Sequence, residues 1–158
     1  METKYPQINF NIVLVEPQIP NNTGNIGRTC VATHSKLHLI EPLGFDISDK
    51  RVKRSGLDYW PELEKEVYPD FQTWYTSVED KSRIFFFSAR AERSFYQTKL
   101  QEGDWLVFGK EAEGLHEDIK SRFSNHLVKI PFPGKVRSFN LSNAVAMALG
   151  EGIRQFKY

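Results

Sequence analysis

The chain has 158 residues, of which 40% are hydrophobic and 26% charged, so it is predicted to form one folded domain over residues 1–158 and a disordered chain is excluded. Its formal net charge of +1 excludes a uniformly basic nucleic-acid binder, so any RNA contact must be a local patch. The single cysteine, Cys30, excludes an internal disulfide framework and a zinc site built on several cysteines.

The first segment, METKYPQINFNIVLVEP, lacks a basic region followed by a long apolar run. No stretch of the chain approaches the ~20 apolar residues that a membrane helix needs. We therefore expect a cytoplasmic protein without membrane contact.

Short apolar runs, rich in β-branched and aromatic side chains and bounded by Pro, Gly or polar residues, predict buried strands. They are INFNIVLVE (8–16), KLHLIEP (36–42), RIFFFSA (83–89), DWLVFG (104–109) and HLVKIP (126–131). Helical patterns occupy residues 25–35, 58–66, 71–78 and 116–123. Because strands and helices alternate, we predict an α/β fold with a mostly parallel sheet and helices on both faces.

The final segment gives the strongest helix signal. Its apolar residues recur at spacings of three and four, which places them on one helix face: Leu141, Val145, Ala148, Leu149, Gly152, Ile153 and Phe156. Gly150 and Gly152 each cost about 1 kcal/mol relative to Ala in a helix. We therefore expect another backbone to approach them, and a helix–helix dimer contact is one candidate.

Ligands of open α/β sheets bind beyond the carboxyl ends of the strands, which directs attention to the loops that follow them. In the first such loop, NNTGNIGR (21–28), a helix N-terminus and Arg28 could hold a phosphate. A turn with an ordinary N-cap explains the same pattern. The loop is neither a Walker loop nor a GxGxxG fingerprint.

The densest positive charge comes from Lys50, Arg51, Lys53 and Arg54, with an aromatic pair at 59–60 close behind. Basic residues interleaved with aromatics suit RNA, in which phosphates give affinity and exposed bases stack. A solvated charged loop is the alternative interpretation.

Glu111 and Glu113 lie in a glycine-bounded loop, where paired carboxylates can serve acid–base chemistry or bind magnesium. Acids at this position more often face solvent or begin a helix, so no metal site is expected. Cys30 and the four histidines are interpreted as structural or surface residues.

The last loop, IPFPGKVRSFNLSN (130–143), is the most unusual segment. Two prolines fix its backbone, a glycine lets it turn sharply, and a run of Ser and Asn residues supplies hydrogen-bond donors and acceptors. A structural cap needs only one or two such residues. We therefore interpret the loop as a shaped polar pocket.

Together the three loops resemble the SPOUT class of RNA ribose methyltransferases, specifically its SpoU branch. The motifs are Asn22 with Arg28, then GKEAEGL (109–115), then Ile130-Pro131 with SFNLSNA (138–144). They occur in the family's order and cover almost the whole chain. The segments NIVLVEPQIPNNTGNIGR, HLIEPLGFDISDKRVKRSGLDYW and FNLSNAVAMAL look most like the small tRNA wobble-position 2′-O-methyltransferases.

The resemblance implies a SPOUT fold with a C-terminal trefoil knot, a homodimer, and no metal. It implies S-adenosylmethionine as cofactor, S-adenosylhomocysteine as product, and a tRNA-Leu-type tRNA as substrate. The reaction would methylate the ribose 2′-OH of the wobble cytidine or modified uridine. Another tRNA position, an rRNA, and a non-catalytic RNA-binding module remain as alternatives.

The resemblance also assigns residues. The catalytic site would comprise Arg28, Asn22, Glu111, Asn140 and Ser142. The cofactor would contact Phe87, Gly109, Ile130, Ser138 and Leu141. The RNA would contact Lys50, Arg51, Lys53 and Arg54.

This sequence departs from the family at three places: Phe87 replaces a smaller aliphatic residue, Lys110 stands where relatives often carry Pro, and Ala112-Glu113 where they often carry Thr-Arg. A free guanidinium has a pKa above ~12, so Arg28 is expected to position the hydroxyl or clamp a phosphate rather than act as a simple base.

Overall fold

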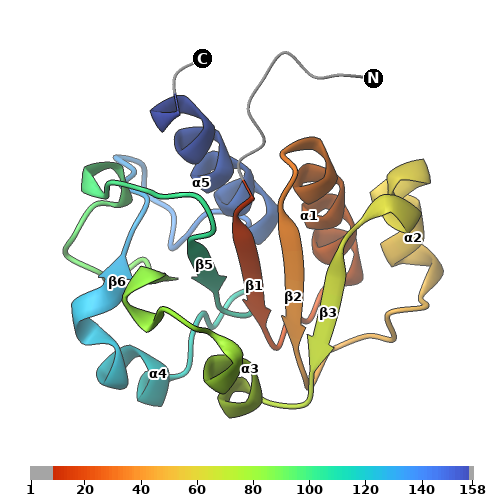
Figure 1. Ribbon diagram of the computed structural model, residues 1–158, viewed down its shortest axis with the longest axis horizontal. Helices are drawn as coiled ribbons and strands as arrows, with labels where there is room; N and C mark the ends of the chain where they lie inside the picture. The colour runs from red at the N-terminus through yellow and green to blue at the C-terminus, as the bar shows by residue number, and fades with distance from the viewer. Residues whose placement is uncertain (1–8, 157–158) are drawn as a thin grey trace.

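The computed structural model describes residues 9–156, in which helices cover both faces of a six-stranded sheet (Figure 1). The strands are β1 (Asn11–Val15), β2 (Lys36–Ile40), β3 (Lys65–Tyr68), β4 (Ile84–Phe87), β5 (Trp105–Phe108) and β6 (Leu127–Val128). The α-helices are α1 (Pro20–Ala32), α2 (Lys50–Gly56), α3 (Phe71–Ser77), α4 (Glu117–Arg122) and α5 (Leu141–Gln155). Four 3-10 turns are η1 (Leu57–Glu62), η2 (Lys81–Arg83), η3 (Phe95–Gln97) and η4 (Ser124–His126).

The strand order is β3-β2-β1-β5-β4-β6, and every pair of neighbours is parallel. All five predicted strands are present, and the predicted α/β class is confirmed. Because β1 lies between β2 and β5, its carboxyl end is adjacent to that of β5, although some ninety residues separate the two strands in sequence. This neighbourhood brings the loop after β1 next to the loop after β5.

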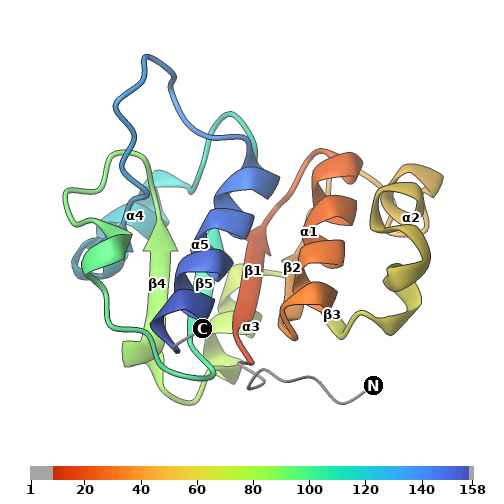
Figure 2. The ribbon, with the colours of Figure 1, turned by 90° about the horizontal axis from the view of Figure 1, so that it is seen from above.

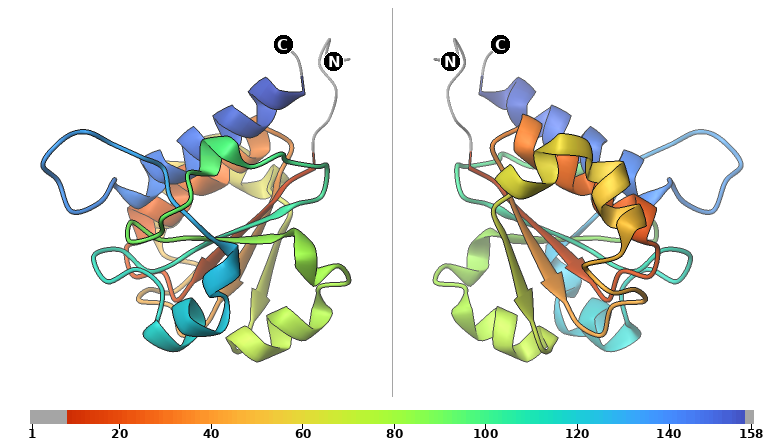
Figure 3. Two further views of the ribbon diagram at one scale, coloured as in Figure 1. Left: turned by 90° about the vertical axis from the view of Figure 1, so that its left-hand side faces the viewer. Right: turned by 90° about the vertical axis from the view of Figure 1, so that its right-hand side faces the viewer.

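Two apolar layers enclose the sheet. Figure 3 shows α1, α2 and α5 on one side and α3 and α4 on the other. On the first side Ile12 and Leu14 of β1 pack with Ile26 and Cys30 of α1. On the opposite side Val13 and Val15 pack among residues of α3 and α4. Alternate residues of β1 thus pack into separate cores, because successive side chains of a strand point to opposite faces of the sheet.

Burial accounts for the state of Cys30. Its side chain is fully enclosed, and desolvation raises the pKa of the thiol far above its ordinary value. The interpretation of Cys30 as a small core residue is confirmed.

The region 50–68 differs from the prediction. The helix predicted over 58–66 is wrong: residues 57–62 form η1 and residues 65–68 form the edge strand β3. The basic cluster is not a loop but the helix α2. The helix α2 is stabilised by packing against α1. A Cβ on Gly24 would lie 2.4 Å from the Val52 carbonyl oxygen, so the backbones of α1 and α2 are in direct contact.

The helix predicted to begin near residue 25 begins at Pro20, whose missing N–H suits the first helical position. Asn22 therefore lies in the first turn of α1, and Arg28 lies nearly two turns further along. Arg28 therefore does not lie at the helix N-terminus, where the sequence pattern placed it.

The predicted final helix is confirmed as α5. Asn140 caps it by accepting from the backbone N–H groups of Ser142 and Asn143. The expected close approach occurs at Gly152, where a Cβ would lie 2.6 Å from the Phe10 ring, so the approaching group is a side chain rather than a backbone. Gly150 faces open space within the described structure.

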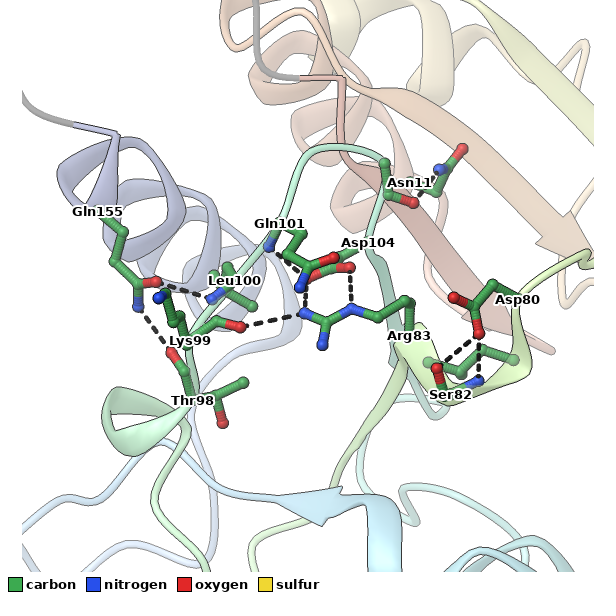
Figure 4. A network of polar contacts seen from close by, with 12 residues as sticks. Asn11, Asp80, Ser82, Arg83, Thr98, Lys99, Leu100, Gln101, Asp104 and Gln155 are labelled. Atoms are coloured by element: carbon green, nitrogen blue, oxygen red, sulfur yellow. Dashed lines mark hydrogen bonds and ion pairs between the residues drawn. The ribbon is translucent and has the colours of Figure 1, made fainter.

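A polar network holds the connection between β4 and β5 against α5 (Figure 4). Arg83 donates to both carboxylate oxygens of the buried Asp104, at 2.7 and 2.6 Å. Gln155 of α5 donates to the Thr98 carbonyl and accepts from the Leu100 N–H. The C-terminal helix is thereby fastened to a segment more than fifty residues earlier. The trefoil knot implied by the family resemblance stays a prediction.

Among the described helices, none is long and apolar enough to cross a membrane.

Candidate functional site

A pocket of about 330 Å³ opens at the carboxyl ends of β4 and β5. Three loops wall it: residues 87–90 after β4, 108–115 after β5, and 129–141 between β6 and α5. Ile19 and Asn22, at the start of α1, complete the wall. This is the position at which parallel α/β sheets bind ligands.

Glu111 connects the loop after β5 to the start of α1. Its carboxylate accepts from the backbone N–H of Gln18 at 2.7 Å and of Ile19 at 3.2 Å. It also accepts from the side-chain amide of Asn22 at 3.3 Å. An anionic carboxylate at a helix N-terminus also interacts favourably with the helix dipole.

Asn140 brings the third loop into the same cluster. Its side-chain nitrogen donates to the Asn22 side-chain oxygen at 3.2 Å. Its own oxygen accepts from the Ser142 N–H and hydroxyl, at 2.9 and 2.6 Å. One continuous hydrogen-bonded chain thus contains four of the five predicted catalytic residues: Asn22, Glu111, Asn140 and Ser142.

The loop after β5 has a backbone that only certain residues allow. A Cβ on Gly109 would lie 2.1 Å from the Gly114 carbonyl carbon, so any side chain at position 109 would collide with the returning chain. Gly114 (φ 73°) and Ala112 (φ 64°) are both in the left-handed region. The Arg137 guanidinium, from the third loop, donates to the Ala112 carbonyl at 2.9 Å and braces this turn.

A charged cluster supports the outer side of the same loop. Lys110 lies 3.8 Å from the Glu16 carboxylate at the end of β1 and 3.4 Å from Glu113. His116, which precedes α4, contacts the same Glu16 carboxylate. Lys110 and Glu113, two of the departures from the family pattern, therefore pair with each other here.

All five residues predicted to bind a cofactor line the pocket: Phe87, Gly109, Ile130, Ser138 and Leu141. The ring of Phe87 stacks on Phe108 at a centroid distance of 4.3 Å and is almost entirely buried. The large side chain is thus absorbed by the core, and the third departure from the family pattern leaves the pocket open.

The pocket combines an apolar floor with polar walls. Phe108, Leu115 and Ile130 are buried side chains of the floor, and the walls carry charged side chains. The lining cations are Arg90, Lys110, Lys120, Lys129 and Arg137. Such a lining fits a small molecule with a flat apolar part and a charged polar part.

Sequence reasoning did not assign Arg137, Lys129 or the N–H groups of Gln18 and Ile19 to the site. Arg137 stands inside the loop that was singled out, so its charge was the available signal. The backbone donors could not be found from the sequence, because they depend on β1 lying beside β5.

Arg28 lies outside the pocket lining. It is exposed on the side of α1 that faces η1, where its guanidinium carbon lies 5.9 Å from the centroid of the Tyr59 ring. The four predicted RNA-binding residues lie on neighbouring α2 and are exposed. Arg51 is held by the Asp49 carboxylate, at 2.9 and 3.2 Å, so it is not free in the way the sequence suggested.

Within residues 9–156, no group of three or more His, Cys, Asp or Glu side chains is arranged to hold a metal ion. Glu111 is instead committed to α1 and Glu113 to Lys110. His38 is buried, with its ring nitrogens 3.0 Å from the Tyr68 hydroxyl and 2.9 Å from the Asn11 side-chain oxygen.

Comparison with known proteins gives consistent matches. The model of the SpoU rRNA Methylase family matches residues 9–150. A tRNA (cytidine(34)-2'-O)-methyltransferase of Burkholderia ambifaria is 43% identical over 148 residues, which cover 92% of this chain and 95% of the relative. A putative tRNA (cytidine(34)-2'-O)-methyltransferase of Bacillus subtilis is 43% identical over 152 residues and 94% of each chain.

Solved structures that resemble this chain belong to the same kind of protein as the sequence relatives. One, described as giving structural insights into the 2-OH methylation of C/U34 on tRNA, has a TM-score of 0.91 and 44% identity, covering 95% of this chain and 97% of the other. The SpoU methyltransferase AviRb of Streptomyces viridochromogenes, in complex with AdoMet, shares the fold with a TM-score of 0.83 at 21% identity. It covers 95% of this chain and 58% of the other.

Proposed function

Because the chain belongs to the SpoU rRNA methylase family, we propose that it methylates the ribose 2′-OH of the wobble nucleotide of tRNA, with S-adenosylmethionine as methyl donor. The wobble nucleotide is a cytidine or modified uridine, and the substrates are tRNA-Leu-type tRNAs. Relatives at 43% identity over almost the whole chain are named for cytidine 34, which supports this position over other RNA sites.

One observation carries the proposal. The hydrogen bonds from Asn22 to Glu111 and from Asn140 to Asn22 join the three motif-bearing segments at the rim of a single pocket. A cap that served only α5 would not need Asn22, and one that served only α1 would not need Asn140. The cluster therefore supports a site that all three segments build together.

The pocket fits the proposed cofactor. Its apolar floor, formed by Phe108, Leu115 and Ile130, suits an adenine ring, and its charged walls suit the amino-acid end. When bound, S-adenosylmethionine supplies an electrophilic methyl group on a sulfonium and leaves as S-adenosylhomocysteine. The protein must then hold the ribose oxygen in line with this methyl and accept or relay the hydroxyl proton.

We assign the positioning of the 2′-hydroxyl to Arg28, because a guanidinium remains protonated near neutrality and donates hydrogen bonds. Arg28 does not line the pocket of its own chain. We therefore propose a homodimer in which Arg28 of the partner subunit reaches the pocket together with the basic helix α2. Exposed apolar side chains support such a contact: Ile19 in the pocket wall, Val136 in the loop between β6 and α5, and Met147 on α5.

The test is methylation in vitro. The purified protein, S-adenosylmethionine and an unmodified tRNA-Leu transcript should yield one 2′-O-methyl group, mapped to position 34 by nuclease digestion and mass spectrometry. A transcript with a 2′-deoxy nucleotide at position 34 is the matched control and should stay unmodified. Methyl transfer to another position would contradict the proposed site, and S-adenosylmethionine binding without transfer would indicate a non-catalytic module.

A further inference from the structure

An exposed tyrosine stands beside the proposed catalytic arginine. The Tyr59 side chain, in η1, is 47% exposed, and the Arg28 guanidinium carbon lies 5.9 Å from its ring centroid. This distance is that of a cation–π contact. The aromatic ring and the cation therefore form one surface unit, although 31 positions separate them in sequence.

Packing fixes the ring in this outward position. The next residue, Trp60, is only 7% exposed and lies against α1, where a Cβ on Gly27 would be 2.7 Å from the indole ring. Glycine at position 27 thus admits the indole, and the indole anchors η1. With Trp60 turned inward, Tyr59 is presented to solvent by a short, anchored turn.

Exposed cations lie on the helix that precedes Tyr59, whereas η1 itself carries the exposed acids Asp58 and Glu62. The helices α1 and α2 lie side by side (Figure 2), and α2 leads directly into η1. Lys50, Lys53 and Arg54 are exposed on α2. No carboxylate in the described part of the chain lies within 4 Å of their charged nitrogens, whereas Arg51 is paired with Asp49. Three cations therefore remain available to an anion.

This combination fits single-stranded nucleic acid. Unpaired bases stack on aromatic rings and on guanidinium planes, and flanking phosphates bind nearby cations. A protein partner would more commonly cover an apolar patch with few charges at its centre. We propose that Tyr59, flanked by Arg28, is a stacking platform for an unpaired base of the RNA substrate, while α2 binds the adjoining phosphates. This inference rests on the proposed function.

Another exposed tyrosine provides a matched control. Tyr96 is 43% exposed and lies in η3, on the connection between β4 and β5. Within residues 9–156 no cation lies over its ring, and it is not part of the pocket lining. It has nearly the same exposure as Tyr59 but none of its surroundings.

The experiment uses an anticodon stem-loop RNA with 2-aminopurine placed in turn at position 34 and at its neighbours. Stacking on Tyr59 should quench the fluorescence at one position in the wild type. Tyr59→Ala and Tyr59→Leu should abolish that quenching and weaken RNA binding about tenfold. Tyr59→Phe and Tyr59→Trp should retain both, since each keeps a ring, and Tyr96→Ala should behave as the wild type.

Tyr59→Leu preserves apolar bulk, so it tests the ring even if Tyr59→Ala unfolds. S-adenosylmethionine affinity, measured by calorimetry, should be unchanged in all variants. Quenching and RNA affinity that survive in Tyr59→Leu would overturn the platform while leaving the proposed function intact. A Tyr59 variant that turns a dimer into a monomer would also overturn it and identify the patch as a subunit contact. A wild type that binds the stem-loop but never methylates it would instead overturn the proposed function.

Discussion

The side-chain amide of Asn140 donates to the amide oxygen of Asn22 at 3.2 Å, across 118 positions of the chain. Asn22 in turn donates to Glu111, so it is the middle member of the chain of contacts that joins the three loops. Asn22→Ala would remove the hydrogen bond from Asn140 and one of the three hydrogen bonds that Glu111 accepts, and each such bond contributes about 0.5–1.5 kcal/mol. We expect reduced stability in urea unfolding and weaker S-adenosylmethionine binding by calorimetry. Asn25→Ala, on the exposed side of the same helix, should change neither.

Substitution of Arg28 should separate S-adenosylmethionine binding from methyl transfer. Because it lies outside the pocket lining, Arg28→Ala should leave S-adenosylmethionine affinity nearly unchanged. Methylation of tRNA should fall by at least about a hundredfold if Arg28 positions the reacting hydroxyl. Arg28→Lys keeps the positive charge but loses the planar guanidinium. Its residual activity therefore distinguishes the contribution of the charge from that of the guanidinium geometry. Methyl transfer at the wild-type rate by Arg28→Ala would refute the assignment.

The pair Arg83–Asp104 is expected to dominate the local stability of the connection between β4 and β5. Asp104 is 1% exposed, and its carboxylate also accepts from the Gln101 N–H at 2.7 Å. The contact with Asp104 raises the pKa of the Arg83 guanidinium, so Arg83 stays charged. Arg83→Met would leave a buried carboxylate without its cation and should destabilise the fold by about 3–5 kcal/mol in urea unfolding.

Its control is Arg90→Met, which removes the exposed partner of Glu117. This change should leave the unfolding midpoint almost unmoved. Equal losses from the two substitutions would mean that burial of Asp104 contributes nothing to the effect.

His38 predicts a specific pH dependence of stability. Burial lowers the pKa of this ring from 6.5 to about 4. The unfolded chain therefore binds the proton more tightly than the folded protein. The stability that depends on the neutral His38 ring is fully present above pH 6.5 and is lost as pH falls toward 4. A shift of this size corresponds to about 3 kcal/mol.

The variant His38→Gln keeps a polar side chain of similar size but does not titrate. Unfolding in urea between pH 7 and 4.5 should show wild-type stability declining more steeply than that of His38→Gln. Parallel curves of stability against pH for the wild type and His38→Gln would refute the assignment of this acid sensitivity to His38. His34→Gln, at an exposed position, serves as the control and should follow the wild type.

The basic residues of α2 should differ in their contribution to RNA binding. Arg54 is exposed, whereas Arg51 is already neutralised by Asp49, which also holds its backbone N–H at 2.8 Å. Arg54→Gln should lower tRNA affinity and reduce the slope of log affinity against log salt by about one. Arg51→Gln should have the smaller effect on both. The reverse order would show that the pair with Asp49 opens when RNA binds.

The sequence predicts elements well where one residue pattern decides them. The five buried strands have continuous apolar runs, and α5 has an uninterrupted stripe with a capping Asn140. Prediction fails where tertiary contacts decide. Three of the four residues of β3 are exposed, so this edge strand has no apolar run. In α2, only Val52 and Gly56 are buried, and the helix depends on its contact with Gly24.

The candidate site divides in the same way. Its side-chain members were predictable because the family motifs name them, and Glu111, Asn22 and Asn140 are found together. Their mutual contacts were not, because they require β5 to pair with β1, and parallel strand order is not encoded in either strand alone. The separation of Arg28 from the pocket was equally hidden, since it follows from α1 beginning at Pro20.

The anchoring of the start of α1 by Glu111 has a consequence for synthesis of the protein. The carboxylate that accepts from Gln18 and Ile19 belongs to a residue translated more than ninety positions later. During elongation the first strand and helix therefore leave the ribosome before this partner exists, and domains emerge N-terminal end first. We expect the nascent amino-terminal half to remain sensitive to protease near residue 18 until the loop after β5 has emerged.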